Sequence, residues 1–150
     1  MNNQDIINVV NRLVETCKDG EFGFRSCAEH VQDEDLHLVL ANRSLDCQRA
    51  AAELQELVSE LGGNPEVGGT ASGALHRGWV AVKSSLSGYS DHAMLAECER
   101  GEDIAMARYR DALGTPLPDS VRGVVERQYE GVKQNHAQVR ALRDSARVTS

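Results

Sequence analysis

The stretch Cys98-Glu99-Arg100-Gly101-Glu102-Asp103 places a run of charge inside a segment that otherwise has the pattern of an amphipathic helix. Glu102 stands four residues after Cys98 and three before Ala105, so its carboxylate lies on the face that such a helix would bury. An unpaired buried carboxylate is costly, so a metal ion, a cation or a proton has to compensate it. The apolar residues that define this face are Met94, Cys98, Ala105, Tyr109 and Ala112.

On both sides of this segment, apolar residues keep helical spacing over most of the chain. No segment alternates with the period of a strand. A chain of 150 residues is about the size of one domain, so residues 1–150 are interpreted as a single domain. The long helices are predicted over residues 5–31, 34–61, 90–113 and 118–146.

Helix ends are marked by residues with special backbone preferences. Asp33 and Ser90 are expected to cap the helices that follow them. Gly62-Gly63-Asn64-Pro65 and residues 114–118 end helices, because glycine takes the left-handed cap and proline cannot continue a helix. A shorter helix over residues 73–86 is expected to carry the chain back along the others. The pattern predicts an all-α, antiparallel four-helix bundle with a short crossover helix.

Composition excludes several classes of partner. The chain has 23 acidic and 16 basic residues, a net charge of −7, which gives it no attraction for nucleic acid or an anionic membrane. No apolar run approaches the ~20 residues of a membrane span, and no signal peptide is apparent, so a cytoplasmic location is expected. The four cysteines form no Cys-x-x-Cys pair and are interpreted as buried free thiols.

Two motifs, Gly73-Ala-Leu-His-Arg-Gly-Trp79 and Glu97-Cys-Glu-Arg-Gly-Glu-Asp103, resemble those of a bacterial family of ferritin-like four-helix-bundle proteins known as a domain of unknown function. Asp19-Gly20-Glu21, Leu61-Gly62-Gly63 and the ending Val139-Arg-Ala-Leu-Arg-Asp144 fit the same pattern. The resemblance covers nearly the whole chain. It implies a ferritin-like bundle, and it implies no particular reaction.

Ferritin-like di-iron proteins carry Glu-x-x-His pairs on two of their helices, whereas this chain has that spacing only once, from Glu34 to His37 at the start of a predicted helix. Counting the helix rise from each helix start nevertheless brings four inward polar residues to a similar height. We therefore predict a mid-bundle polar layer, with Asp46 at its edge and with these members: Glu21, Arg43, Glu102 and Gln128.

Two interpretations of this layer are open. In the first, Glu21, Glu102 and Asp46 are oxygen ligands of a metal such as iron or manganese. In the second, Arg43 and Gln128 satisfy the carboxylates in a buried ion-pair network without a metal, because a guanidinium supplies the positive charge that a metal would bring. We prefer the second, which predicts no cofactor and a non-catalytic structural or stress-associated protein. A metal-binding oxidoreductase or metal store is the alternative.

The same counting places Cys27, Cys98 and His136 near one level, which is the donor set of a thiol-based metal buffer or sensor for zinc or cuprous copper. This is a second alternative function. Cys17 and Cys47 also share a level, although a disulfide is unexpected in a reducing compartment. His76 and Trp79 are expected to fasten the crossover helix to the bundle. A homodimer is the expected self-association, through apolar residues that flank the inward faces.

Overall fold

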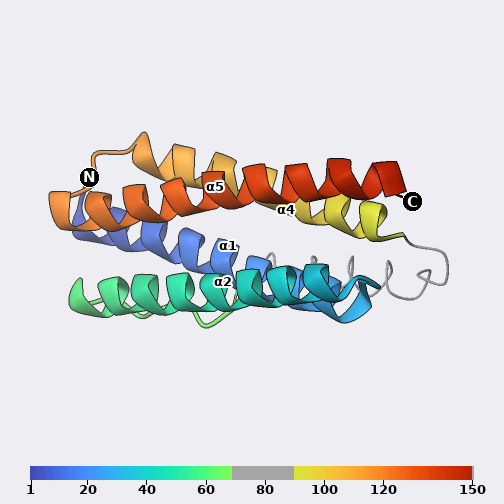
Figure 1. The fold of residues 1–150 in the computed structure, drawn as a ribbon. Coiled ribbons are helices and arrows are strands. Elements are labelled where there is room, and N and C mark those ends of the chain that lie inside the picture. Colours follow the sequence, from blue (N-terminus) through green and yellow to red (C-terminus); the bar gives the residue numbers. More distant parts are fainter. Residues whose placement is uncertain (69–89, 150) are drawn as a thin grey trace.

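The computed structural model describes residues 1–68 and 90–149, and these residues form four long helices and no strand. Figure 1 shows the helices packed lengthwise, with the two termini at opposite ends of the bundle. The predicted antiparallel four-helix bundle is confirmed. The predicted crossover helix, with His76 and Trp79, lies outside the described residues. The helices are α1 (Asn3–His30), α2 (Glu34–Glu60), α4 (Asp91–Leu113) and α5 (Asp119–Thr149).

The helices begin at side chains that accept hydrogen bonds from free backbone N–H groups. Asp33 accepts from the N–H of Leu36 at 3.1 Å, and Ser90 accepts from the N–H of Ala93 at 3.2 Å, so both predicted caps are confirmed. After α2 the chain turns at Gly62, whose φ of +83° is a left-handed conformation that favours glycine. Local sequence therefore set the helix boundaries to within a few residues.

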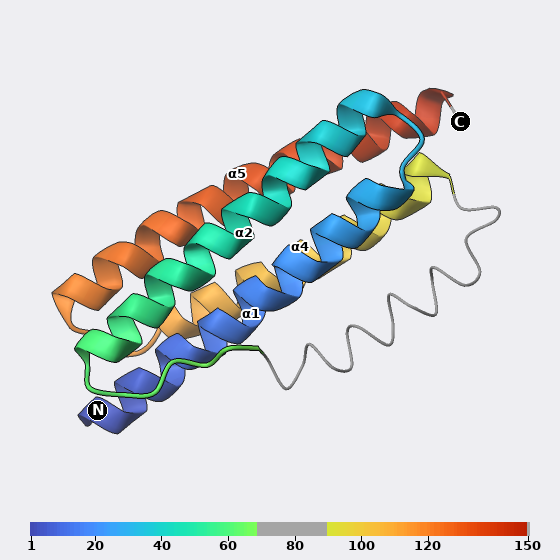
Figure 2. The same ribbon diagram turned by 90° about the horizontal axis from the view of Figure 1, so that it is seen from below.

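The order of the helices around the bundle follows from two short connections. Residues 31–33 join α1 to α2, and residues 114–118 join α4 to α5, so each pair is antiparallel. Asp91 at the start of α4 accepts the backbone N–H groups of Gln32 and Asp33 at 2.8 and 3.0 Å. This contact places the start of α4 at the end of α1 (Figure 2), so α1 and α4 also run antiparallel. Of the neighbouring helices, α2 and α5 contact each other least.

The α1–α2 interface is close at Gly20. A Cβ atom at this position would lie 2.9 Å from Sγ of Cys47, nearer than two such atoms approach in proteins. The glycine is therefore required sterically for the spacing of these two helices.

The apolar core consists of two clusters, one in each half of the bundle. The first contains residues such as Leu13, Leu54 and Val125, and the second contains residues such as Phe24, Leu40 and Val139. Between them lies a layer of buried polar side chains, whose members are Thr16, Asp19, Arg43, Ser44, Glu99, Glu102 and Gln128. None of the helices within residues 1–68 and 90–149 is long and apolar enough to cross a membrane.

Candidate functional site

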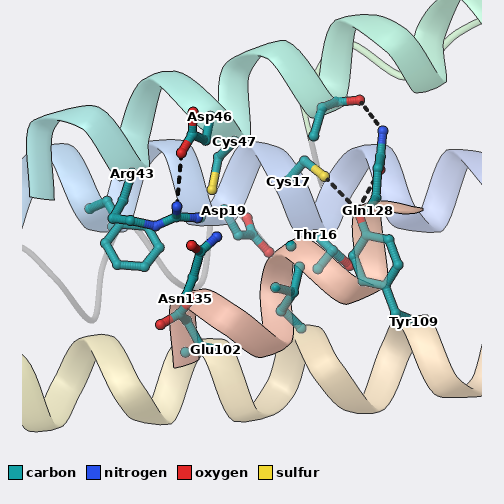
Figure 3. Close-up of a pocket in the computed structure, with 18 of the residues that line it drawn as sticks. Thr16, Cys17, Asp19, Arg43, Asp46, Cys47, Glu102, Tyr109, Gln128 and Asn135 are labelled. Carbon is teal, nitrogen blue, oxygen red and sulfur yellow. Dashed lines mark hydrogen bonds and ion pairs between the residues drawn. The ribbon is translucent and has the colours of Figure 1, made fainter. Parts of the chain in front are cut away.

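One half of the polar layer is built around Arg43 of α2. Its Nη1 atom lies 2.8 Å from Oδ2 of Asp46, one turn further along the same helix. Its guanidinium also lies over the ring of Phe24, 5.8 Å from the ring centroid. The Arg43 side chain is only 9% exposed whereas that of Asp46 is 48% exposed, so this ion pair joins the interior to the surface. Figure 3 shows Arg43 projecting from α2 toward Asp19 and Asn135.

Glu102 of α4 is the most buried carboxylate of the layer, at 5% exposure. Burial raises its pKa from 4.5 to about 7, Arg43 opposes this increase, and Asp103 and Glu99 add to it. Within the described part of the chain, its Oε1 atom accepts no hydrogen bond. The charge of this carboxylate is therefore only partly compensated, and a proton balances it over much of the neutral range.

Asp19 of α1 is the second buried carboxylate. Burial raises its pKa from 3.8 to about 6, Arg108 of α4 opposes this increase and Glu15 adds to it. Arg108 Nη1 lies 4.0 Å from Asp19 Oδ2, and it also donates a hydrogen bond of 3.3 Å to the hydroxyl of Thr16. Oδ1 of Asp19 has no hydrogen-bond partner among the described residues.

The other half of the layer is a chain of hydrogen bonds through Tyr109. The Tyr109 hydroxyl donates to Oε1 of Gln128 at 2.7 Å and lies 3.2 Å from Sγ of Cys17. Gln128 in turn donates from Nε2 to Glu53 at 2.7 Å and to the carbonyl oxygen of Ala50 at 3.3 Å. Burial raises the pKa of the Cys17 thiol to about 11 and holds that of Tyr109 well above its usual range, so both groups are protonated.

A cavity of about 1110 Å³ lies in this layer and is lined by side chains of all four described helices. Asp19, Arg43 and Glu102 line it together with Tyr109, Gln128 and Cys98. Glycines from three of the helices also line it: Gly20, Gly23, Gly101 and Gly131.

The structure corrects the predicted position of Glu21. Its carboxylate pairs with Lys18 at 3.5 Å and with Arg25 at 4.0 Å, both on its own helix, and it does not join Arg43 or Glu102. The inward face of α1 passes through Asp19 and Gly20 at this level, which rotates Glu21 toward the surface.

Gln128 is buried at the predicted level, but its partners differ from those expected. It binds the Tyr109 hydroxyl and Glu53 instead of Glu21 or Glu102. The single layer predicted from the sequence is therefore two separate groups, one around Arg43 and one around Tyr109.

The side chains present do not fit the di-metal interpretation. Among residues 1–68 and 90–149, no three His, Cys, Asp or Glu side chains converge in a way that could hold a metal ion. Glu21 faces away from Glu102, and Asp46 is engaged by Arg43 and, at 3.6 Å, by Arg49. The proposed ligands Glu21, Glu102 and Asp46 are thus not brought together.

The Cys27, Cys98 and His136 group is only partly assembled. The Cys98 thiol lies 3.0 Å from Sγ of Cys27, and the Cys27 thiol lies 3.8 Å from the carbonyl oxygen of Met94. His136 instead contacts Asp103 through Nε2 at 2.6 Å, on the outer side of α4. His136 does not contact the two thiols, since its Nε2 atom lies against Asp103 and 3.9 Å from Oε1 of Glu99, both on α4. All four cysteines are free thiols.

Two important residues were missed by reasoning from the sequence. Asp19 was not recognised as buried, although Thr16, Asp19 and Gly23 form a second stripe with spacings of three and four residues beside the apolar one. Tyr109 was identified as an apolar core position only. Its role as a hydrogen-bond donor depends on Gln128 from another helix, which no local signal reports.

Comparison with known families gives a match over most of the chain. Residues 5–115 match the family model described as a domain of unknown function, DUF2383. No protein of curated function matches the sequence significantly.

The fold itself has solved relatives. A mutant of Dps1 from Mycobacterium smegmatis superposes with a TM-score of 0.73 at 14% identity, covering 93% of this chain and 95% of that one. The Dps protein from Vibrio cholerae O1, described as a member of a broad superfamily of ferritin-like diiron-carboxylate proteins, gives a TM-score of 0.74 at 16% identity, covering 93% and 89%. At these identities the likeness shows the fold alone, and it confirms the ferritin-like bundle.

Proposed function

The chain belongs to the DUF2383 family, for which no activity is described, and we propose that it is a non-catalytic ferritin-like bundle with a structural or stress-associated role. In this proposal, a layer of arginine and carboxylate groups takes the place that a di-metal centre has in ferritin-like diiron-carboxylate proteins. The observation that carries the proposal is the ion pair of 2.8 Å between Arg43 and Asp46, formed beside buried Glu102. A buried guanidinium and a divalent cation repel each other, so they compete for the same carboxylates.

The chemistry of the layer supports a role without turnover. A di-metal centre needs several carboxylates that point at one spot, and among the described residues no third His, Cys, Asp or Glu side chain joins Asp19 and Glu102 in a group that could hold a metal ion. The buried thiol of Cys17 and the hydroxyl of Tyr109 also stay protonated, so neither acts as an ionised nucleophile.

Elemental analysis of protein purified without chelator tests the proposal. We expect much less than one equivalent of iron or manganese, and no increase when ferrous iron is added under anaerobic conditions. The matched variants Glu102→Gln and Glu126→Gln should have the same metal content, because neither carboxylate holds a metal; Glu126 is exposed on α5 outside the cavity. Two equivalents of metal in the wild type, lost in Glu102→Gln only, would favour the metal store or oxidoreductase.

One observation keeps the thiol-based alternative testable. Cys98 and Cys27 are in direct contact, with 3.0 Å between their sulfur atoms, and two thiolates suffice for a cuprous ion. A thiol buffer would bind one equivalent of cuprous copper in the wild type and none in Cys98→Ser. Under the main proposal, both proteins take up the ion equally weakly, because the hydrogen bond with Cys27 and burial hold the pKa of Cys98 well above its usual value.

A further inference from the structure

The mid-bundle cavity has features that a structural role does not need. Its volume of about 1110 Å³ is slightly larger than that of most sites for small organic ligands, roughly 300–1,000 Å³. It lies between the two apolar clusters, where Figure 3 shows polar side chains from several helices facing one another. Exposed residues such as Arg49 and Arg100 also line the cavity, so it reaches solvent and a ligand can enter it.

Three buried side chains around the cavity have polar atoms without a partner in the described part of the chain. These atoms are Oε1 of Glu102, Oδ1 of Asp19 and Nε of Arg43. The residues are 5%, 9% and 8% exposed, so little water is available to satisfy them. Buried polar atoms are normally hydrogen-bonded, so each of these three residues, all of which line the cavity, has an unused donor or acceptor.

The charges of these groups indicate which kind of ligand is missing. Arg43 already has a carboxylate at 2.8 Å, that of Asp46. Asp19 has a cation only at 4.0 Å, and Glu102 forms no ion pair within residues 1–68 and 90–149. Two of the three unpartnered atoms are therefore carboxylate oxygens without a close cation, on neighbouring helices, and these two require positive charge and N–H donors.

We propose that this cavity binds a small aliphatic amine, whose ammonium groups donate hydrogen bonds to Glu102 and Asp19. An ammonium carries three N–H donors and a full positive charge, which matches acceptor oxygens that lack partners. The raised pKa values of both carboxyl groups agree with a site that lacks its cation.

The rest of the lining suits the hydrocarbon part of such a ligand. Phe24, Ala105 and Val132 line the same cavity, together with the glycines, so methylene groups would lie against apolar surface. A bare metal ion would leave most of this volume empty, and the described residues do not offer it three ligands. An organic anion would face the carboxylates of Asp19 and Glu102, whereas the arginines that line the cavity each already lie within 4.0 Å of a carboxylate: Arg43, Arg49, Arg100, Arg108 and Arg127.

This inference depends on the proposed function in one respect, which is that Glu102 holds no metal. The elemental analysis above measures that point independently of amine binding, so the two proposals can fail separately. A protein with no metal and no affinity for amines would contradict this inference and leave the proposed function standing.

Calorimetric titration of the whole chain with putrescine tests the proposal at about pH 8, where the amine is protonated and both carboxyl groups are ionised. We expect one equivalent to bind. Butylamine, with one ammonium group, should bind more weakly, and butyrate and butanol should not bind measurably. Failure of putrescine to bind, or tighter binding of butyrate than of butylamine, overturns the proposal.

Two pairs of variants show whether binding occurs in the cavity. Glu102→Gln removes the charge at constant shape and should weaken putrescine binding at least about tenfold, the effect of losing one charged hydrogen bond. Glu126→Gln makes the same chemical change outside the cavity and should bind like the wild type. Equal affinities of these two variants would place the amine elsewhere and contradict the proposal.

The second pair uses two glycines of α5 whose surroundings are equally open. A Cβ atom at Gly131 or at Gly123 would meet nothing within 4 Å, but only Gly131 lines the cavity. Gly131→Leu should occupy part of the volume and weaken putrescine binding at least about tenfold, whereas Gly123→Leu should leave it unchanged. Circular dichroism confirms that each variant is folded, and loss of binding in both variants or in neither would overturn the assignment.

Discussion

The hydroxyl of Tyr109 donates a hydrogen bond of 2.7 Å to Oε1 of Gln128, which joins α4 to α5 inside the core. Because a phenol has a single O–H hydrogen, the Cys17 thiol must be the donor in its contact of 3.2 Å with the same oxygen. Gln128 then donates to Glu53 of α2. One continuous set of hydrogen bonds therefore crosses α1, α4, α5 and α2.

Replacing Tyr109 with phenylalanine should reduce the free energy of unfolding by about 1–3 kcal/mol, because Oε1 of Gln128 would stay buried without a donor. Urea denaturation measures the change. Tyr129→Phe is the matched control, since this ring stacks on Tyr109 with 6.4 Å between centroids and its hydroxyl has no hydrogen bond to any other described residue. The control should lose less than about 0.5 kcal/mol. Equal losses in both variants would show that the hydrogen bond contributes nothing.

Glu102 should make the protein less stable as pH rises. Its pKa is about 7 in the folded chain against 4.5 as a free group. Between these two pH values the folded state therefore keeps a proton that the unfolded state has lost. Its contribution is most favourable below about pH 4.5 and is lost as pH rises through about 7. Asp19, with a pKa raised to about 6, acts in the same direction. Arg43 of α2 and the carboxylates Asp103 and Glu99 of α4 act on Glu102 in this range.

The Glu102→Gln variant should therefore be more stable than the wild type by up to about 3 kcal/mol at about pH 8, and equally stable at about pH 4. Chemical denaturation over this pH range measures the difference, and Glu126→Gln should follow the wild-type curve. A variant that is less stable than the wild type at high pH would show that Glu102 is compensated in the folded protein.

Arg43→Met should destabilise the protein by about 3–5 kcal/mol at about pH 8, because it leaves Glu102 buried beside no cation. The double variant Arg43→Met with Glu102→Gln should recover part of that loss, with a coupling energy of about 0.5–3 kcal/mol. Arg49→Met is the control, since Arg49 pairs with the same Asp46 but is 76% exposed, and it should lose less than about 1 kcal/mol. Purely additive losses would contradict an interaction between Arg43 and Glu102.

Gly20→Ala should destabilise the bundle by about 1–3 kcal/mol, because the new Cβ would lie against Sγ of Cys47. Gly123→Ala, at an open position of α5, should instead stabilise it by about 0.5–1 kcal/mol through helix propensity. Thermal denaturation compares the two. In a Cys47→Ala background the Gly20→Ala substitution should cost less, since the opposing sulfur is absent. Stabilisation by Gly20→Ala in the wild-type background would refute the close contact.

The candidate site was only partly visible in the sequence. Burial of Arg43, Glu102 and Gln128 followed from their places in apolar stripes, and the structure places all three inside. Their partners could not be predicted in the same way. A step of one residue turns a side chain by about 100° around a helix, so Asp19 and Glu21 lie on opposite flanks of the apolar stripe, and only the packing of α1 against the other helices decides which flank is buried.

The sequence by itself determined the order, length and ends of the described helices and the presence of buried charge among them. These features depend on local periodicity, on capping side chains and on glycine and proline, all of which act within a few residues. Only the tertiary structure decided that Arg43 pairs with Asp46, that Tyr109 binds Gln128, and that a cavity remains beside Glu102. Those outcomes depend on how each helix is rotated and spaced against its neighbours, which is fixed by packing between residues far apart in the chain.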